Sequence, residues 1–375
     1  MSCAYRVKFA QSVRYNIKNK QMSANKKILQ LVSGWAAVEL IIQCVVYGLW
    51  QFVRLSANSL WRGCRRKPSK SYPVEVTVDT AIGSHCYIKI MGVKYHYVET
   101  GPKSGPMVLV LSDAPDRGNL WGASWSRAVR RLVESGHRVV TLDLRGTGGS
   151  EGGARGDLSP PAVVEELAAL MRALGAAEQN PATVIGFGIG GMVAWYLVHC
   201  HDALVSKFVV VGAPHPNLYW QHPPAPFCGG ALHFIQWPYL PERWLAEREI
   251  RDGEGGWAST RACDWAGALN YIRGAAWWRI RPGLVASPPA LLVGGQGSAA
   301  ELVASAQHCA APTLRLVATP DAADPELPLI IMDFLVAKAK LPEVEGTGRG
   351  LVGRVLGAVA GRGRELTARL VLPPA

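Results

Sequence analysis

The stretch from Ala182 to Val198, ATVIGFGIGGMVAWYLV, constrains the fold of this chain more than any other. A short apolar run rich in β-branched residues enters a cluster of glycines, and an apolar segment of helical length follows. Glycines at such a junction permit a backbone with positive φ and a close approach between the strand and the helix. The stretch therefore predicts a sharp turn from a buried strand into a helix, with Gly188 at its tip.

Two interpretations fit this turn. Gly186, Gly188 and Gly191 match the G-x-G-x-x-G fingerprint of dinucleotide-binding domains. That fingerprint belongs in the first βα turn and needs an acidic residue about 20 positions later. Here several predicted strands come first, and the next strand, 207–213, ends without Asp or Glu. The second interpretation, a nucleophile elbow in which Gly186 and Gly190 flank position 188, is therefore favoured.

The rest of the chain from about residue 74 alternates strand and helix patterns. Short continuous apolar runs are typical of parallel strands that are buried on both faces. Such runs occupy 106–112, 137–144, 207–213, 289–295 and 312–319, with helical patterns at 124–135, 160–175 and near 329–339. The alternation predicts a parallel sheet covered by helices. The tryptophan- and proline-rich excursion at about 216–286 interrupts this order, and we interpret it as an inserted helical lid.

The net charge of +12 is concentrated at one end of the chain. Residues 1–72 contain 13 Lys and Arg and one acidic residue, whereas the other 303 residues contain 27 of each sign. A nucleic-acid-binding protein is expected to carry its basic charge on the folded domain. The distribution therefore argues against nucleic acid as a partner and favours a membrane.

Residues 28–53 form an apolar stretch that is long enough to cross a bilayer as a helix. Glu39, near the middle, costs about 3 kcal/mol on insertion, and the 13 Leu, Ile, Val and Phe residues return roughly 4–8 kcal/mol. A single-pass membrane helix is the prediction, and an interfacial or buried helix is the alternative. The basic residues that flank the stretch are balanced, so the sequence does not orient it.

The predicted domain organisation has five parts. They are a basic tail at 1–27, the membrane helix at 28–53, a basic linker at 54–73, the folded domain at 74–340 and a disordered Gly/Arg-rich tail at 341–375. The eight cysteines show neither metal-ligand nor disulfide spacing. We therefore expect free thiols, no metal site and no cofactor.

The turn and several further motifs resemble the epoxide hydrolase branch of the α/β-hydrolase fold, above all its membrane-anchored animal members. The motifs that carry the resemblance are GFGIGG (186–191), DLRGTGGSE (143–151), APHPNLY (213–219), QWPYLPE (236–242) and GALNYIRG (267–274). The resemblance covers about 74–340. It implies a mostly parallel eight-stranded sheet with helices on both faces and an inserted helical lid, behind an N-terminal anchor in the endoplasmic reticulum or another endomembrane.

The resemblance also implies where catalytic groups belong, and this chain departs from the pattern at each position. A carboxylate nucleophile is expected at Gly188, a second acid near Ser298 and a histidine near Ala318. The lid tyrosine is displaced, with Tyr271 one place before the expected position. The oxyanion loop reads Ser112, Asp113, Ala114, and a carboxylate there opposes a developing anion. Ile189 follows the empty nucleophile position.

These departures predict a catalytically inactive protein, because the members of a catalytic constellation act as a unit. We expect it to bind an apolar small molecule under the lid or to engage a protein partner. The alternative is an active hydrolase on lipophilic epoxides or esters that uses displaced residues such as Ser298, His308 or Asp113. His215 is expected to be structural.

Overall fold

A central sheet of eight strands organises the folded part of the chain. The computed structural model describes residues 28–32, 34–62, 83–113, 123–221, 230–252, 262–318, 320 and 324–336. The strand order is β10-β9-β7-β6-β4-β5-β3-β2, and only the pairs β2–β3 and β3–β5 are antiparallel. The strands are β2 (Ser84–Ile90), β3 (Val93–Thr100), β4 (Met107–Leu111), β5 (Arg138–Leu142), β6 (Ala182–Phe187), β7 (Val205–Val211), β9 (Ala290–Gly295) and β10 (Pro312–Val317). The predicted mostly parallel eight-stranded sheet is confirmed.

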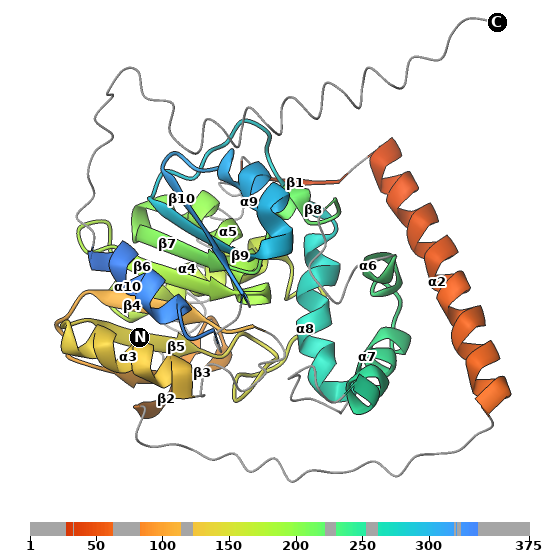
Figure 1. The fold of residues 1–375 in the computed structure, drawn as a ribbon, viewed down its shortest axis with the longest axis horizontal. Helices are drawn as coiled ribbons and strands as arrows, with labels where there is room; N and C mark the ends of the chain where they lie inside the picture. The colour runs from red at the N-terminus through yellow and green to blue at the C-terminus, as the bar shows by residue number, and fades with distance from the viewer. Residues whose placement is uncertain are drawn as a thin grey trace, which may run out of the picture. The chain divides into compact units, whose positions relative to one another are not determined.

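Both faces of the sheet are buried at the central strands β4, β6, β7 and β9, which explains their continuous apolar runs. The edge strands β2 and β10 are largely exposed, so the run at 312–319 is not buried on both faces as predicted. Alternate residues of one strand point to opposite faces. In β4, Leu109 and Leu111 belong to one core cluster and Val108 and Val110 to the other. The helices α4 (Pro160–Ala173), α5 (Ile189–Cys200) and α9 (Ala299–Ala306) contribute to the first cluster, and α3 (Ala123–Glu134) and α10 (Leu327–Val336) contribute to the second (Figure 1).

The predicted lid is helical in the described residues. It contains α6 (Ala231–Phe234), α7 (Leu240–Asp252) and α8 (Ala262–Ala275) between β7 and β9. An internal ion pair stabilises it, because Arg273 donates to Glu242 at 2.7 Å and also to the carbonyls of Ile235 and Trp237. The excursion differs from the prediction in one respect, since a short strand, β8 (Trp278–Ile280), follows α8.

The base of the lid rests on the loop after β5. The DLRGTGGSE loop brings Gly146 so close to Gly267 of α8 that a Cβ at Gly267 would lie 2.0 Å from the Gly146 carbonyl oxygen. Gly267 therefore permits a backbone-to-backbone contact that no larger residue would allow. At the other end of the lid, the Asn217 side chain both donates to and accepts from the backbone of Ile280 in β8, at 2.7 and 2.9 Å.

The N-terminal apolar segment forms a strand followed by a helix. β1 (Leu29–Leu31) pairs antiparallel with β8, and α2 (Trp35–Arg62) follows. The predicted helix at 28–53 was thus wrong at both ends, because residues 29–31 find a strand partner and the helix continues beyond residue 53. Within α2, the 23 residues Trp35–Ala57 are long and apolar enough to cross a membrane.

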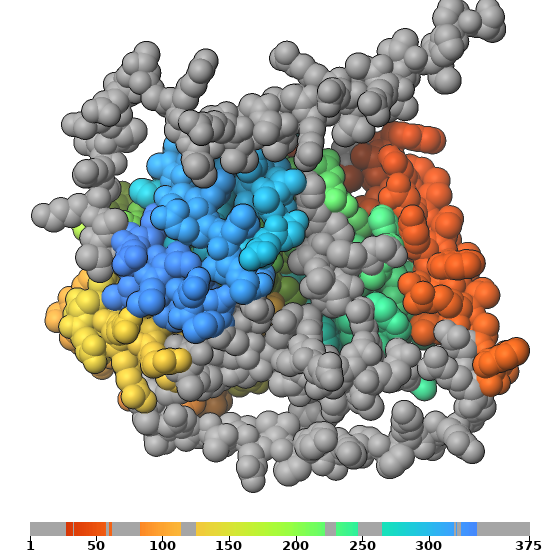
Figure 2. All heavy atoms as spheres, viewed as in Figure 1, coloured from red at the N-terminus to blue at the C-terminus, as the bar shows by residue number. Residues whose placement is uncertain are grey.

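One face of α2 packs on the lid (Figure 1, Figure 2). Leu40, Cys44, Gly48 and Gln51 are buried on this face, and they recur at helical spacing. The opposite face exposes large apolar side chains, namely Trp35, Val38, Ile41, Ile42, Val45, Val46, Leu49, Trp50, Phe52 and Val53. We call this set the outer stripe. Such a continuous exposed apolar surface marks a site of contact with lipid or protein.

Several predicted segments lie outside the described residues. They are the basic tail at 1–27, most of the linker at 54–73, and the Gly/Arg-rich tail at 341–375. The same holds for parts of the lid, at 222–229 and 253–261. Cys44, Cys86, Cys200 and Cys309, whose side chains the structure describes, are free.

Candidate functional site

The turn after β6 has the geometry that its glycines permit. Gly188 has φ of 49° and ψ of −114°, a conformation that non-glycine residues adopt only under strain. On either side of it the helix and strands are in close contact. A Cβ at Gly186 would lie 2.7 Å from the Cα of Gly191, and one at Gly190 would lie 2.4 Å from the carbonyl oxygen of Leu111. Glycine at 186 and 190 is therefore explained by packing.

A carboxylate from another strand lies where a side chain at position 188 would point. Asp113 follows β4, which neighbours β6 in the sheet. A Cβ on Gly188 would lie 2.3–2.4 Å from the carboxyl atoms of Asp113. The backbone N–H of Ile189 donates to Asp113 Oδ1 at 2.9 Å. The amide that follows the tip of the turn is thus already bonded to an anion of the same chain.

The other residues of the predicted oxyanion loop do not add a donor in the described structure. Ser112 is buried, and its hydroxyl donates to the carbonyl of Leu142 at 3.2 Å. Ala114 lies outside the described residues. Tyr219, buried under the lid, lies near this carboxylate. Burial raises the pKa of Tyr219, and the charges of Asp113 and Glu301 raise that pKa further.

The three positions that the resemblance assigns to a triad lie at the same edge of the sheet. Gly188 follows β6, Ser298 follows β9, and Ala318 follows β10, so all three stand at the carboxyl ends of parallel strands. Ser298 donates its hydroxyl to the carbonyl of Gly295 at 3.0 Å, which closes its own turn. Ala318 is exposed and carries no titratable group. The chain therefore has the three backbone positions of a triad but does not have the catalytic side chains at them.

The histidines that could replace the missing base belong to a separate cluster. The His215 ring stacks on that of His308 with centroids 3.7 Å apart, and its Nε2 lies 3.2 Å from Nε2 of His199. His199 is ten residues beyond Ile189 on α5, which places it about 15 Å along the helix axis from the turn. Burial lowers the pKa of His199 to about 4 and that of His215 well below its usual range. These rings therefore pack as neutral groups away from the turn.

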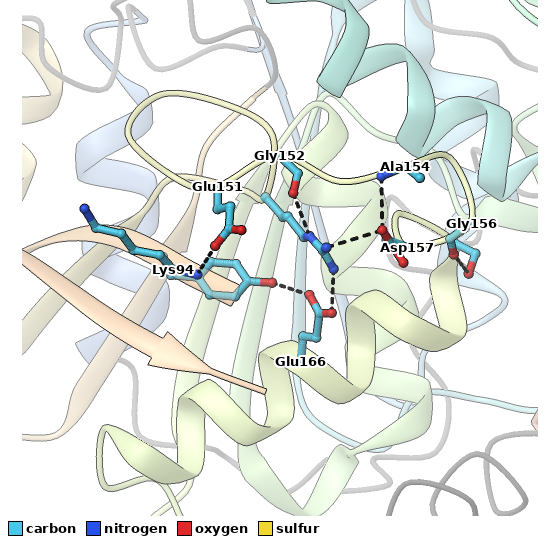
Figure 3. A network of polar contacts seen from close by, with 10 residues as sticks. Lys94, Glu151, Gly152, Ala154, Gly156, Asp157 and Glu166 are labelled. Atoms are coloured by element: carbon cyan, nitrogen blue, oxygen red, sulfur yellow. Dashed lines mark hydrogen bonds and ion pairs between the residues drawn. The ribbon is translucent and has the colours of Figure 1, made fainter. Parts of the chain in front are cut away.

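Tyr271 is also held inside a structural cluster. It is 2% exposed, and burial raises the pKa of its hydroxyl, with Glu166 adding to the effect. Glu166 accepts from Tyr95 and pairs with Arg145 at 2.7 Å, and Arg145 also contacts Asp157 (Figure 3). The arginine of the DLRGTGGSE loop thus joins β3, α4 and the loop itself. Arg145 therefore fixes the loop after β5, on which Gly267 of α8 rests, against α4.

A small cavity lies between α5 and the lid among the described residues. A cavity bordered by Met192, Tyr219, Trp220, Leu232 and Ile272 has a volume of about 10 Å³. That volume holds about one water molecule. The aromatic residues of the excursion therefore fill this part of the lid interface instead of lining a large cavity. The described residues also contain no group of three or more His, Cys, Asp or Glu that could hold a metal ion.

Sequence reasoning missed two features of this region. Asp113 was recognised as unfavourable for an oxyanion loop, but its approach to Gly188 was not predicted. Glu301, on α9 just beyond Ser298, has its pKa raised to about 7 by burial. Glu301 lies three residues after Ser298, where the resemblance expects an acid, and this closeness in sequence could have identified it.

Comparisons with known proteins agree with this architecture. Residues 115–227 match the family model for the alpha/beta hydrolase fold. A putative α/β hydrolase from Nostoc superposes with a TM-score of 0.57 at 17% identity, covering 68% of this chain and 98% of that one. An epoxide hydrolase from Vigna radiata superposes with a TM-score of 0.53 at 18% identity, over 68% and 99% of the two chains.

The chain is an α/β-hydrolase-fold protein. Among curated relatives, human epoxide hydrolase 4 is 31% identical over 184 residues, which cover 47% of this chain and 49% of the relative. Epoxide hydrolase 3 of Xenopus tropicalis is 31% identical over 205 residues, 53% of each chain. The chain spans about half the length of these relatives. Within the α/β-hydrolase fold it is therefore similar to the epoxide hydrolases, as its motifs imply.

Proposed function

We propose that this α/β-hydrolase-fold protein is a membrane-associated, epoxide-hydrolase-like protein that does not catalyse hydrolysis. One observation carries the proposal. The space in front of Gly188 is filled by the Asp113 carboxylate, which the Ile189 amide holds. A substrate oxygen that needed this amide would have to displace a bound anion. The amide therefore cannot serve as a free, preorganised donor.

The environment of the turn supports the same proposal. Ester hydrolysis would need a base that activates water, yet Ala318 stands where the resemblance expects histidine. His215, His199 and His308 contact one another instead. The outer stripe of α2 offers a surface to a lipid or protein partner outside the lid.

The test is a turnover assay on the full chain in detergent. We expect styrene oxide and p-nitrophenyl esters to be converted no faster than with the Asp113→Asn variant. Asp333→Asn, an exposed change on α10, is the matched control for removal of an acidic group. Steady turnover by the unaltered chain that Asp113→Asn abolishes and Asp333→Asn preserves would contradict the proposal.

A second candidate is an active hydrolase that uses Asp113 as a displaced nucleophile, and the place of its carboxylate in front of Gly188 favours it. In that reaction a carboxylate oxygen attacks an epoxide carbon, the ring C–O bond breaks, and an ester and an alkoxide form. Release of the diol then needs water and a base. Intact-mass measurement after incubation with the epoxide distinguishes the inactive protein from one in which Asp113 attacks the substrate. The unmodified mass supports the first proposal, and a stable adduct on Asp113 indicates attack without release.

Membrane association is proposed through the outer stripe of α2. The stripe is apolar and exposed, as contact with acyl chains requires. It includes Trp35 and Trp50, and tryptophan is enriched at the boundary between headgroups and acyl chains. Full single-pass insertion would require α2 to leave the lid, because lipid would have to replace the contacts of Leu40, Cys44 and Gly48. Flotation of the full chain with vesicles tests association. We expect Ile42→Glu with Val46→Glu on the stripe to reduce it and Glu134→Gln on α3 to leave it unchanged.

A further inference from the structure

A pocket of about 520 Å³ lies between the start of α2, β1 and the end of the lid. We call it the anchor pocket. Its polar lining includes Glu39, Gln43, His233 and Arg279, and its apolar lining includes Leu40 and Trp220. Ligand sites in proteins commonly have volumes of about 300–1,000 Å³ and combine apolar walls with a few placed polar groups. The anchor pocket has both properties, and it is separate from the turn at Gly188.

Specific contacts fix the walls of the anchor pocket. Leu29 to Leu31 pair with Trp278 to Ile280, and the N–H of Val32 donates to the carbonyl of Trp277 at 2.8 Å. On the α2 side, His233 Nε2 and Gln43 Oε1 are 2.9 Å apart. The pocket is therefore bounded by paired strands and by a hydrogen-bonded helix contact.

The polar groups present one charge of each sign. The Glu39 carboxylate accepts from Gln43 at 3.1 Å. One nitrogen of the Arg279 guanidinium donates to the carbonyls of Ala275, Ala276 and Trp278 at 3.1–3.2 Å, which fixes the cation in place. Nδ1 of His233 is buried without a hydrogen-bond partner among the described residues. The His233 ring is stacked against Tyr47 and contacts Trp220, which fixes its place in the pocket wall.

The anchor pocket borders the outer stripe of α2. Trp35, Ile42 and Val46 are four residues before, three after and seven after Glu39, so they lie on the same side of the helix. All three are exposed, by 78%, 53% and 57%. A molecule with its polar end in the pocket could therefore extend an alkyl chain along an apolar surface that is already present.

We infer that the anchor pocket binds the headgroup of a zwitterionic phospholipid, with Glu39 facing the ammonium and Arg279 facing the phosphate. Trp220 also lines the pocket, and an indole ring can act as a cation–π partner for an ammonium group. A purely anionic head would place a second negative charge beside Glu39, and a purely cationic head would face Arg279. The inference rests on the proposed membrane association for the source of the lipid, and on the pocket alone for the recognition.

The binding test uses the full chain in a maltoside detergent and short-chain lipids that remain monomeric. Dihexanoylphosphocholine is the main probe, dihexanoylphosphatidic acid is the anionic probe, and phosphocholine without chains represents a soluble source. We expect the zwitterionic lipid to bind tightest in native mass spectrometry. Glu39→Gln should weaken its binding by roughly fivefold or more relative to the anionic lipid, and the control Glu134→Gln should not.

Three results would overturn the inference. They are equal affinity for the zwitterionic and anionic lipids, an unchanged preference in Glu39→Gln, and binding of phosphocholine as tight as that of the lipid. Because these probes are monomers, a protein that fails to float with vesicles can still show the preference. Failure of membrane association and failure of headgroup recognition are therefore distinguished.

Discussion

The indole of Trp237 lies directly over Gly48, so that a Cβ at position 48 would be 1.8 Å from its Nε1 atom. The same N–H donates to the carbonyl of Cys44 at 2.8 Å. Gly48 is therefore the point at which α2 can approach the lid. Glycine inside a helix is unfavourable by roughly 0.5–1 kcal/mol relative to alanine, so a close contact of this kind is a physical reason for its presence.

We predict that Gly48→Leu separates α2 from the lid. The leucine side chain cannot share space with Trp237, and the hydrogen bond to Cys44 is lost with the contact. Hydrogen exchange in the lid residues 231–246 should rise and the melting temperature should fall. Val45→Leu, on the exposed face of the same helix, is the matched control and should change neither.

We predict that Gly188→Asp alone does not create an epoxide hydrolase. A non-glycine residue with φ of 49° costs about 1–3 kcal/mol, and its Cβ meets the Asp113 carboxyl group. The single variant should therefore melt lower than the unaltered chain. Adding Asp113→Gly should recover part of the stability.

Neither of these variants should turn over styrene oxide, because Ala318 still provides no base. The triple variant with Ala318→His is the first in the series that has both a nucleophile and a base. Turnover by Gly188→Asp alone would show that a base is present at the turn after all.

We predict a large cost for breaking the ion pair inside the lid. Arg273 and Glu242 are 5% and 7% exposed, and Arg273→Met leaves the Glu242 carboxylate buried without its cation. Loss of one partner of a buried pair costs about 3–5 kcal/mol. Limited proteolysis and thermal melting should both reveal this loss of stability in Arg273→Met. Arg273→Met combined with Glu242→Leu should recover stability, and Arg172→Met, an exposed change on α4, should have little effect.

We predict that acid destabilises the protein through the histidine cluster. Burial and the nearby His308 lower the pKa of His199 to about 4, whereas the unfolded chain has an ordinary histidine pKa near 6.5. The unfolded state therefore binds more protons between about pH 6.5 and pH 4, and stability falls as the pH decreases through this window.

The measurement is the melting temperature between pH 8 and pH 4. His199→Gln removes one titrating ring and should make the decline shallower while leaving the value at pH 8 close to that of the unaltered chain. His137→Gln, a partly exposed change that leaves this cluster intact, is the control. An equally steep decline in His199→Gln would show that acid acts on the protein elsewhere.

The sheet and the turn could be predicted because their signals are local. The continuous apolar runs at 106–112 and 289–295 became β4 and β9 within one residue at each end. The glycines at 186 and 190 were explained by contacts within a few residues or with the neighbouring strand. Periodicity and backbone stereochemistry act over such short distances, so one sequence is enough to reveal them.

The contact of Asp113 with position 188 could not be predicted in the same way. It joins residues 76 positions apart in chain order, from Asp113 to Ile189, and depends on the exact register of β4 and β6. The bounds of the N-terminal helix could not be predicted for a related reason. Its composition suits a membrane helix, and only tertiary contacts show that Leu29 pairs with β8 and that Gly48 meets Trp237. Gln43, Gly48 and Gln51, together with Glu39, were the available signal within this apolar stretch.

The pairing of β1 with β8 also sets a mechanical path through the molecule. On the N-terminal side of α2, residues 28–32 are bonded to the end of the lid through the β1–β8 pairs and the backbone hydrogen bonds Val32 to Trp277 and Arg281 to Ile28. Asn217 in turn bonds β8 on both sides of Ile280, and Trp237 holds the middle of α2 at Cys44 and Gly48. A displacement of α2 would therefore strain both ends of the lid at once.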